Sequence, residues 1–149
     1  MCKTVKDKLG SNYFSIYLLD AFLEKGVTDI WTKTSPRKWA GTNDNVEIKV
    51  CDFTNCCKVT LDDPERNDQE RSAVDKFTDP NLLGTCFNTS LKGKLSATLS
   101  KDGSDGWYPD WAKIVLYQGR TFLCNFGTWL DDSAGYSTSM TTQCLGKDT

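Results

Sequence analysis

Most of the chain beyond residue 26 consists of short apolar or alternating segments separated by Gly, Pro, Asn and Asp. The clearest is 46–50, Val-Glu-Ile-Lys-Val, whose alternation is typical of a strand with one buried face. Such segments recur at intervals of about 8–12 residues, the spacing found in β-sandwiches. The sequence predicts strands at 30–34, 46–50, 56–61, 72–77, 91–99, 113–117 and 120–124. The expected fold is therefore an all-β sandwich, followed after Trp129 by a polar, irregular tail.

One α-helix is expected ahead of the strands, over residues 12–25. Ser11 or Asn12 can cap its start, and Gly26 can end it. Apolar side chains crowd much of this segment, so it must bury against its own domain or against a second subunit. The lysines before it would also suit a membrane surface, although packing against a core is the commoner use.

Seven cysteines in 149 residues are many for a single domain. This density favours an oxidising compartment and a disulfide framework, so we expect a secreted chain in which Met1 is an added start. The pairing is open, and an odd count leaves one thiol free or bridging two chains. Zinc binding by Cys51, Cys56, Cys57 and Cys86 is the alternative, although no Cys-x-x-Cys pair supports it. The disulfide candidates are Cys2, Cys51, Cys56, Cys57, Cys86, Cys124 and Cys144.

Composition excludes several functional classes. There is no histidine, so neither a Ser-His-Asp nor a Cys-His catalytic arrangement can form. The net charge of −2 gives no electrostatic basis for binding nucleic acid. No apolar run reaches the roughly 20 residues of a membrane span. Asn88-Thr89-Ser90 is a glycosylation sequon, which would be exposed in a secreted chain.

Acidic residues are concentrated in segment 61–71, Leu-Asp-Asp-Pro-Glu-Arg-Asn-Asp-Gln-Glu-Arg. Pro64 and the Asp and Asn residues predict a tight loop that crowds carboxylates together. Such an oxygen-rich cluster is what calcium selects, with about 6–8 oxygen ligands. The alternative is a solvated acidic turn in which Arg66 and Arg71 are the counter-charges.

Two further oxygen-rich loops, 35–45 and 101–111, are expected at the same end of the sandwich as loop 62–68. They carry the aromatic residues Trp39, Trp107 and Tyr108. Exposed Trp and Tyr at loop tips suit a membrane interface, where an amphipathic ring lies at the level of the headgroups. The alternative is that these rings pack at the end of the core. For Trp111, which lies beside the predicted strand 113–117, we favour packing in the core.

Seven short motifs occur in the order found in PLAT (lipoxygenase-homology) domains, and the chain resembles that family over about residues 29–132. The motifs are 40–46 (AGTNDNV), 61–71 (LDDPERNDQER), 75–77 (DKF), 83–84 (LG), 107–111 (WYPDW), 124–125 (CN) and 129–132 (WLDD). The departures are Trp39 where calcium-binding members can have Asp, Glu65 for Gly, Gln69 for an aromatic residue, and Ala73 near a common Gly. The helix 12–25 and the cysteines lie outside the family pattern.

The resemblance implies an eight-stranded antiparallel β-sandwich that binds lipids or proteins and is not an enzyme. It also implies calcium sites in the loops at one end. One would use Asp62, Asp63, Glu65 and Asn67 or Asp68. The other would use the carbonyls of Gly41 and Trp111 with the carboxylate of Asp110, and is weakened by Trp39.

We therefore expect a helical extension at 1–28, a sandwich at 29–132 and a disulfide-tethered tail at 133–149. The expected function is calcium-assisted attachment to a lipid or membrane surface through loops 35–45, 62–68 and 101–111. The alternative is a protein-interaction subunit of a secreted venom, egg, mucus or matrix assembly, with a homo- or heterodimer formed through the odd cysteine or helix 12–25. Catalysis by a carboxylate pair such as Asp68 and Asp110 has no supporting spacing.

Overall fold

The computed structural model describes residues 26–133 and 135–147, and these form eight strands and two short 3₁₀ helices. The predicted helix 12–25 and Cys2 lie outside the described residues. The strands are β1 (Val27–Thr34), β2 (Val46–Cys51), β3 (Cys56–Thr60), β4 (Val74–Phe77), β5 (Ser96–Lys101), β6 (Pro109–Leu116), β7 (Thr121–Asn125) and β8 (Ser139–Lys147). The 3₁₀ helices are η1 (Gly84–Asn88) and η2 (Tyr117–Gly119). No helix among the described residues is long and apolar enough to cross a membrane.

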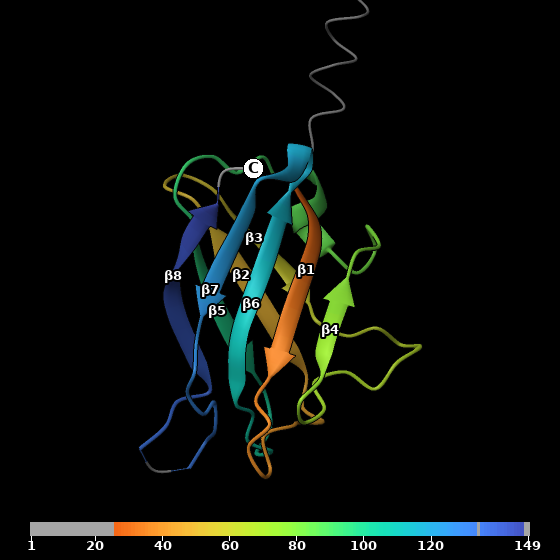
Figure 1. The fold of residues 1–149 in the computed structure, drawn as a ribbon, viewed down its shortest axis with the longest axis vertical. Helices are drawn as coiled ribbons and strands as arrows, with labels where there is room; N and C mark the ends of the chain where they lie inside the picture. The colour runs from red at the N-terminus through yellow and green to blue at the C-terminus, as the bar shows by residue number, and fades with distance from the viewer. Residues whose placement is uncertain (1–25, 134, 148–149) are drawn as a thin grey trace, which may run out of the picture.

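All strand pairs are antiparallel, in the order β3-β2-β5-β8-β7-β6-β1-β4. The first half of β8 pairs with β5, and its second half pairs with β7. The sheet therefore folds over at β8 into two layers, with β4, β1, β6 and β7 in front and β3, β2 and β5 behind (Figure 1). This confirms the all-β, eight-stranded antiparallel prediction.

The prediction of an irregular tail after Trp129 is wrong, because residues 139–147 form the strand that joins the two layers. The expected disulfide tether is present as Cys124–Cys144. Its sequence, Ser-Met-Thr-Thr-Gln-Cys-Leu-Gly-Lys, is mostly polar, and only Cys144 is buried. Strand formation here depends on pairing with neighbours on both sides and not on a hydrophobic pattern. The sandwich therefore extends beyond the expected boundary at residue 132.

The core lies between the layers and is built from alternate residues of the strands. In β2, for example, Val46, Ile48 and Val50 are buried while Lys49 is exposed. This is the alternation expected of a sheet with one face on the core.

Three disulfides link the six cysteines of the described residues: Cys51–Cys56, Cys57–Cys86 and Cys124–Cys144. They close the β2–β3 hairpin, tie β3 to η1 and join β7 to β8. The zinc alternative is wrong because its four sulfurs are used in two of these bonds. The disulfides indicate an oxidising environment.

The loops 35–45, 61–73 and 102–108, which we call the loop end, lie at one end of the sandwich, as predicted (Figure 1, lower part). Thr42 connects all three: its amide donates to the Gln69 carbonyl at 3.1 Å and its hydroxyl to the Asp105 carbonyl at 2.8 Å. The loop predicted at 101–111 is shorter than expected, because Lys101 ends β5 and Pro109 begins β6.

Candidate functional site

The acidic turn after β3 is organised around the guanidinium of Arg66. Its Nε donates to Asp68 at 2.5 Å and lies 3.6 Å from an oxygen of Asp75, while Nη1 lies 3.3 Å from Asp63. Nη2 donates to the Lys76 carbonyl at 3.0 Å. We call Asp63, Arg66, Asp68 and Asp75 the Arg66 cluster. The positive charge that balances these carboxylates therefore comes from the Arg66 guanidinium of the same chain.

Local sequence explains this geometry. The amides of Glu65 and Arg66 donate to the side chain and carbonyl of Asp63, which sets the turn at Pro64. The buried Asp68 carboxylate accepts the Asp63 amide at 2.5 Å. Each of these bonds directs a carboxylate or carbonyl oxygen towards a backbone amide of the same turn.

Asp75 is the inward-facing acid of β4. Burial raises the pKa of its carboxyl, and the nearby Asp68 acts in the same direction. The Gln69 amide, which donates to it at 2.8 Å, and the Arg66 guanidinium oppose that rise in pKa. Gln69 adopts a left-handed φ of 60° and is buried, with its side chain donating to the Leu61 carbonyl.

A second cationic side chain lies between the other two loops. Lys101 continues the inward-facing row of Ala97 and Leu99 in β5, and its side chain is 0% exposed. Its ammonium donates to Asp44 Oδ2 at 2.8 Å and to the Gly103 carbonyl at 3.0 Å. It also reaches the Asp102 carbonyl at 3.4 Å. We call these three oxygens and the ammonium the Lys101 cage.

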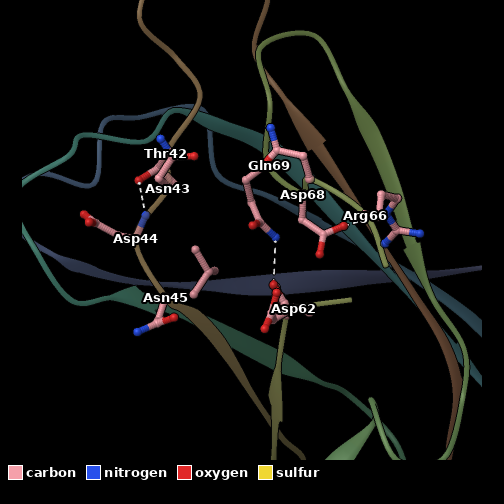
Figure 2. A pocket seen from close by; sticks show the side chains of 11 residues that line it. Thr42, Asn43, Asp44, Asn45, Asp62, Arg66, Asp68 and Gln69 are labelled. Carbon is pink, nitrogen blue, oxygen red and sulfur yellow. Dashed lines mark hydrogen bonds and ion pairs between the residues drawn. The ribbon is translucent and has the colours of Figure 1, made fainter. Parts of the chain in front are cut away.

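The first set of predicted calcium ligands is only partly brought together. Asp63 and Asp68 belong to the Arg66 cluster, whereas the side chains of Asp62, Glu65 and Asn67 are exposed and bond to no other described residue. Asp62 and Asp68 line a small pocket of about 100 Å³, together with Asn67 and with Asp44 of the first loop (Figure 2).

The second predicted set is also dispersed. Asp110 and Trp111 lie within β6, where Trp111 is paired with β1 on one side and β7 on the other. Gly41 instead packs against the backbone of residues 69–71. Among residues 26–133 and 135–147, no three acidic, cysteine or histidine side chains converge as metal ligands. Neither predicted set therefore gathers in full around one position in the described residues, and calcium binding by them stays a prediction.

Only one of the three predicted contact aromatics projects into solvent. Trp39 is 77% exposed, with a left-handed φ of 67°. The predicted exposure of Trp107 is wrong: it is 0% exposed in the core, and its indole N–H donates to Thr34 Oγ1 at 2.9 Å. Tyr108 is half-buried, with its hydroxyl bonded to the Gly127 carbonyl and the Arg37 guanidinium 4.5 Å from its ring.

Trp39 borders a surface groove of about 520 Å³. The backbone of the loop that carries Trp39 is held by two hydrogen bonds of the next residue. The Ala40 amide donates to the Arg37 carbonyl, and the buried Ala40 carbonyl accepts the Tyr108 amide. The Lys38 ammonium lies 5.3 Å from the Trp39 ring centre. The groove is lined by Lys38, Trp39, Gly41, Thr42, Asn43, Glu70, Arg71 and Asp105.

Two residues that are prominent in the structure, Lys101 and Phe53, have no distinguishing motif in the sequence. Lys101 was placed in a turn, although its period-two spacing from Leu99 and Ala97 places it on the inward face. Phe53 is 99% exposed at the tip of the β2–β3 hairpin, and no sequence pattern distinguishes it from a packed loop residue. Asn88 is exposed at the end of η1, as a glycosylation site would need to be.

Comparison with known sequences gives no match, either to a family model or to a curated protein. Comparison with solved structures gives several. One is coral 8R-lipoxygenase, described as activated by calcium via a C2-like domain, with a TM-score of 0.63 and 16% identity over 78% of this chain. Another is the alpha-toxin of Clostridium absonum, with a TM-score of 0.54 and 15% identity over 80% of this chain. The alpha-toxin of Clostridium perfringens matches with a TM-score of 0.55 and 16% identity over 83% of this chain.

The chain spans 16% of the length of the lipoxygenase and 32% of each toxin, so only one part of those proteins is matched. At this level of identity the likeness shows the fold alone. The described residues form an all-β antiparallel sandwich similar to one part of the lipoxygenase and of the clostridial alpha-toxins.

Proposed function

We propose that this chain is a non-catalytic binding module that attaches to a lipid surface through Trp39 at the loop end. The observation that carries the proposal is the outward, fixed position of Trp39. An indole held at a loop tip is suited to the headgroup region of a bilayer, where its ring is buried and its N–H stays hydrated. Support also comes from the shared fold with part of a lipoxygenase described as having a C2-like domain.

The energy available from one such ring is small. Trp buries about 200 Å² of surface, and at about 25 cal/mol per Å² an indole that is 77% exposed can gain about 4 kcal/mol. That gain corresponds to a dissociation constant of about 1 mM. Attachment through Trp39 is therefore weak and reversible, and it needs help from neighbouring groups such as Lys38 or from a second attached module.

The headgroup class follows from charge. Acidic side chains outnumber basic ones at the loop end, and the Arg66 cluster and the Lys101 cage neutralise only some of them. The remaining negative charge repels anionic headgroups. We therefore propose that the surface is zwitterionic, and that calcium does not mediate contact with it.

The test is co-sedimentation of the oxidised protein with phosphatidylcholine vesicles, in chelator and in calcium. We expect binding in both, loss of detectable binding in Trp39→Ala, and no loss in Phe53→Ala, an exposed aromatic at the opposite end. Phosphatidylserine added to the vesicles should weaken binding. Equal binding by wild type and Trp39→Ala would refute the proposal, and binding that appears only in calcium would refute its calcium-independent form.

A second candidate, protein–protein association of a secreted subunit, is favoured by Phe53. The Cys51–Cys56 disulfide closes its hairpin, and Asp52 accepts the Thr54 and Asn55 amides at 2.8 and 2.6 Å. A fully exposed ring on so constrained a turn is suited to a pocket in a partner. Sedimentation of the full chain tests self-association: a dimer lost in Phe53→Ser would support it, and a monomer at all concentrations would exclude a second copy as the partner.

A further inference from the structure

We propose that the Lys101 ammonium acts as a built-in cation that joins the loops before β2 and after β5, so that this end of the protein is ordered without calcium. The first reason is position. Lys101 is the last residue of β5 on its inward face, and its register partner is Val46 at the start of β2. The side chain therefore enters the space where the loops before β2 and after β5 meet.

The second reason is the set of oxygens around the ammonium. A carboxylate oxygen of Asp44 and the carbonyls of Asp102 and Gly103 lie 2.8, 3.4 and 3.0 Å from Nζ. Carboxylate and carbonyl oxygens from neighbouring turns are the ligands that hard cations take in proteins. A lysine ammonium has three N–H donors and no acceptor, so the three oxygens match its bonding capacity.

The third reason is that the surrounding backbone is shaped to bring these oxygens together. Gly103 has a φ of 75°, and a Cβ there would lie only 2.2 Å from a carboxylate oxygen of Asp44. Asp44 also accepts the Asp105 amide at 2.9 Å, and the two Asp102 carboxylate oxygens accept the backbone and side-chain N–H of Asn45 at 2.9 Å. The two loops are thus joined through groups that surround the Lys101 cage.

The fourth reason is that the other acidic turn also contains a basic side chain among its carboxylates. The Arg66 guanidinium lies among Asp63, Asp68 and Asp75 as the ammonium lies among its oxygens. A divalent ion entering either place would meet a fixed positive charge within a few ångströms and would have to displace it. The carboxylates therefore remain paired with side chains of the same chain at the calcium concentrations that extracellular modules bind.

The experiment measures calcium binding directly, on the full oxidised chain, by calorimetry and by thermal melting in chelator and in about 1 mM calcium. That concentration is at or above the dissociation constants of extracellular calcium modules. For the unsubstituted protein we expect no binding heat and no change in Tm. Calcium binding by the unsubstituted protein would overturn the inference.

The decisive variant is Lys101→Met, which keeps the apolar stem and removes the ammonium. We expect a lower Tm in chelator and a rise of about 2–5 °C in calcium, because the freed oxygens now accept the ion. Lys101→Met/Asp44→Asn is the matched control, since it lacks the carboxylate and should not respond. A folded Lys101→Met with no response to calcium would also overturn the inference.

If Lys101→Met does not fold in chelator, its refolding in calcium becomes the readout. Recovery of the native circular dichroism spectrum supports the inference, and failure to recover counts against it. None of these measurements includes lipid, so their outcome is separate from that of the vesicle test of the proposed function.

Discussion

The Arg66 cluster leads to the strongest prediction about stability, for the substitution Arg66→Met. This change keeps a long apolar side chain against Phe77, whose ring lies 5.1 Å from the guanidinium carbon, and removes the positive charge. The buried carboxylates of Asp68 and Asp75 then lose their only nearby cation among the described residues. The hydrogen bond to the Lys76 carbonyl is lost as well.

The magnitude follows from burial. Removing one partner of a fully buried ion pair costs about 3–5 kcal/mol. Arg66 is 36% exposed, and solvent screens part of its interaction, so we expect a loss of about 2–3 kcal/mol. For a domain of this size that loss lowers Tm by about 5–10 °C.

The loss must also depend on pH. Burial already raises the pKa of Asp75 above 3.8, and Arg66 acts against that rise, so Arg66→Met raises it further. The native variant therefore binds this proton at a pH where the unfolded chain has released it. Its stability recovers as pH falls from neutral, and the gap in unfolding free energy between variant and wild type narrows as pH passes down through the raised pKa of Asp75.

Urea unfolding at several pH values measures both effects, and Arg71→Met is the control because Arg71 lies on the same loop but is exposed and makes no ion pair with a described residue. We expect its unfolding free energy to stay within about 0.5 kcal/mol of wild type. A loss under about 1 kcal/mol for Arg66→Met at pH 7, or a gap that does not change with pH, would refute the reasoning.

Three further predictions follow from the core. Because burial raises the pKa of Asp75, stability should fall as pH rises through that pKa; Asp75→Asn should reduce this slope in urea titrations, and an unchanged slope would contradict the assignment. Removing the Cys57–Cys86 disulfide by double alanine substitution should cost about 3–4 kcal/mol in unfolding free energy, since it closes a loop with a sequence separation of 29; a loss under about 1 kcal/mol would contradict this. Trp107→Phe should cost about 2–3 kcal/mol in thermal melts, because it leaves Thr34 Oγ1 without its buried donor; an unchanged Tm would contradict it.

Alternation made β2 predictable, and short segments bounded by turn residues made β6 and β7 predictable, while the sandwich architecture led us to expect the three loops at one end. Those features depend on neighbours in sequence. The strand β8 was missed because its residues are held by hydrogen bonds to β5 and β7, while its side chains are mostly polar and exposed. Pairing on both sides outweighs the absence of a hydrophobic pattern.

The position of Trp107 likewise depends on partners that are distant in the sequence. Its neighbours Gly106 and Pro109 favour a projecting turn, and that local interpretation is reasonable. The backbone instead bridges to Leu130, with N···O distances of 2.9 and 2.7 Å in the two directions, which holds the ring inward. The acceptor of its indole N–H is 73 residues away in the sequence. Only the folded chain brings these partners together.

The acidic loops show which sequence feature decides between a metal site and an internal ion pair. The number of carboxylates does not distinguish a metal site from an internal ion pair, because each needs negatively charged oxygens close together. What differs is the register of nearby basic residues. In a strand, positions alternate between the two faces, so a lysine two residues beyond a buried Leu99 points inward, whereas a lysine at position 100 would point to solvent. The alternation of β5 continues through its last residue, although turn residues follow at once, and this register alone is enough to place a cation among the acidic loops.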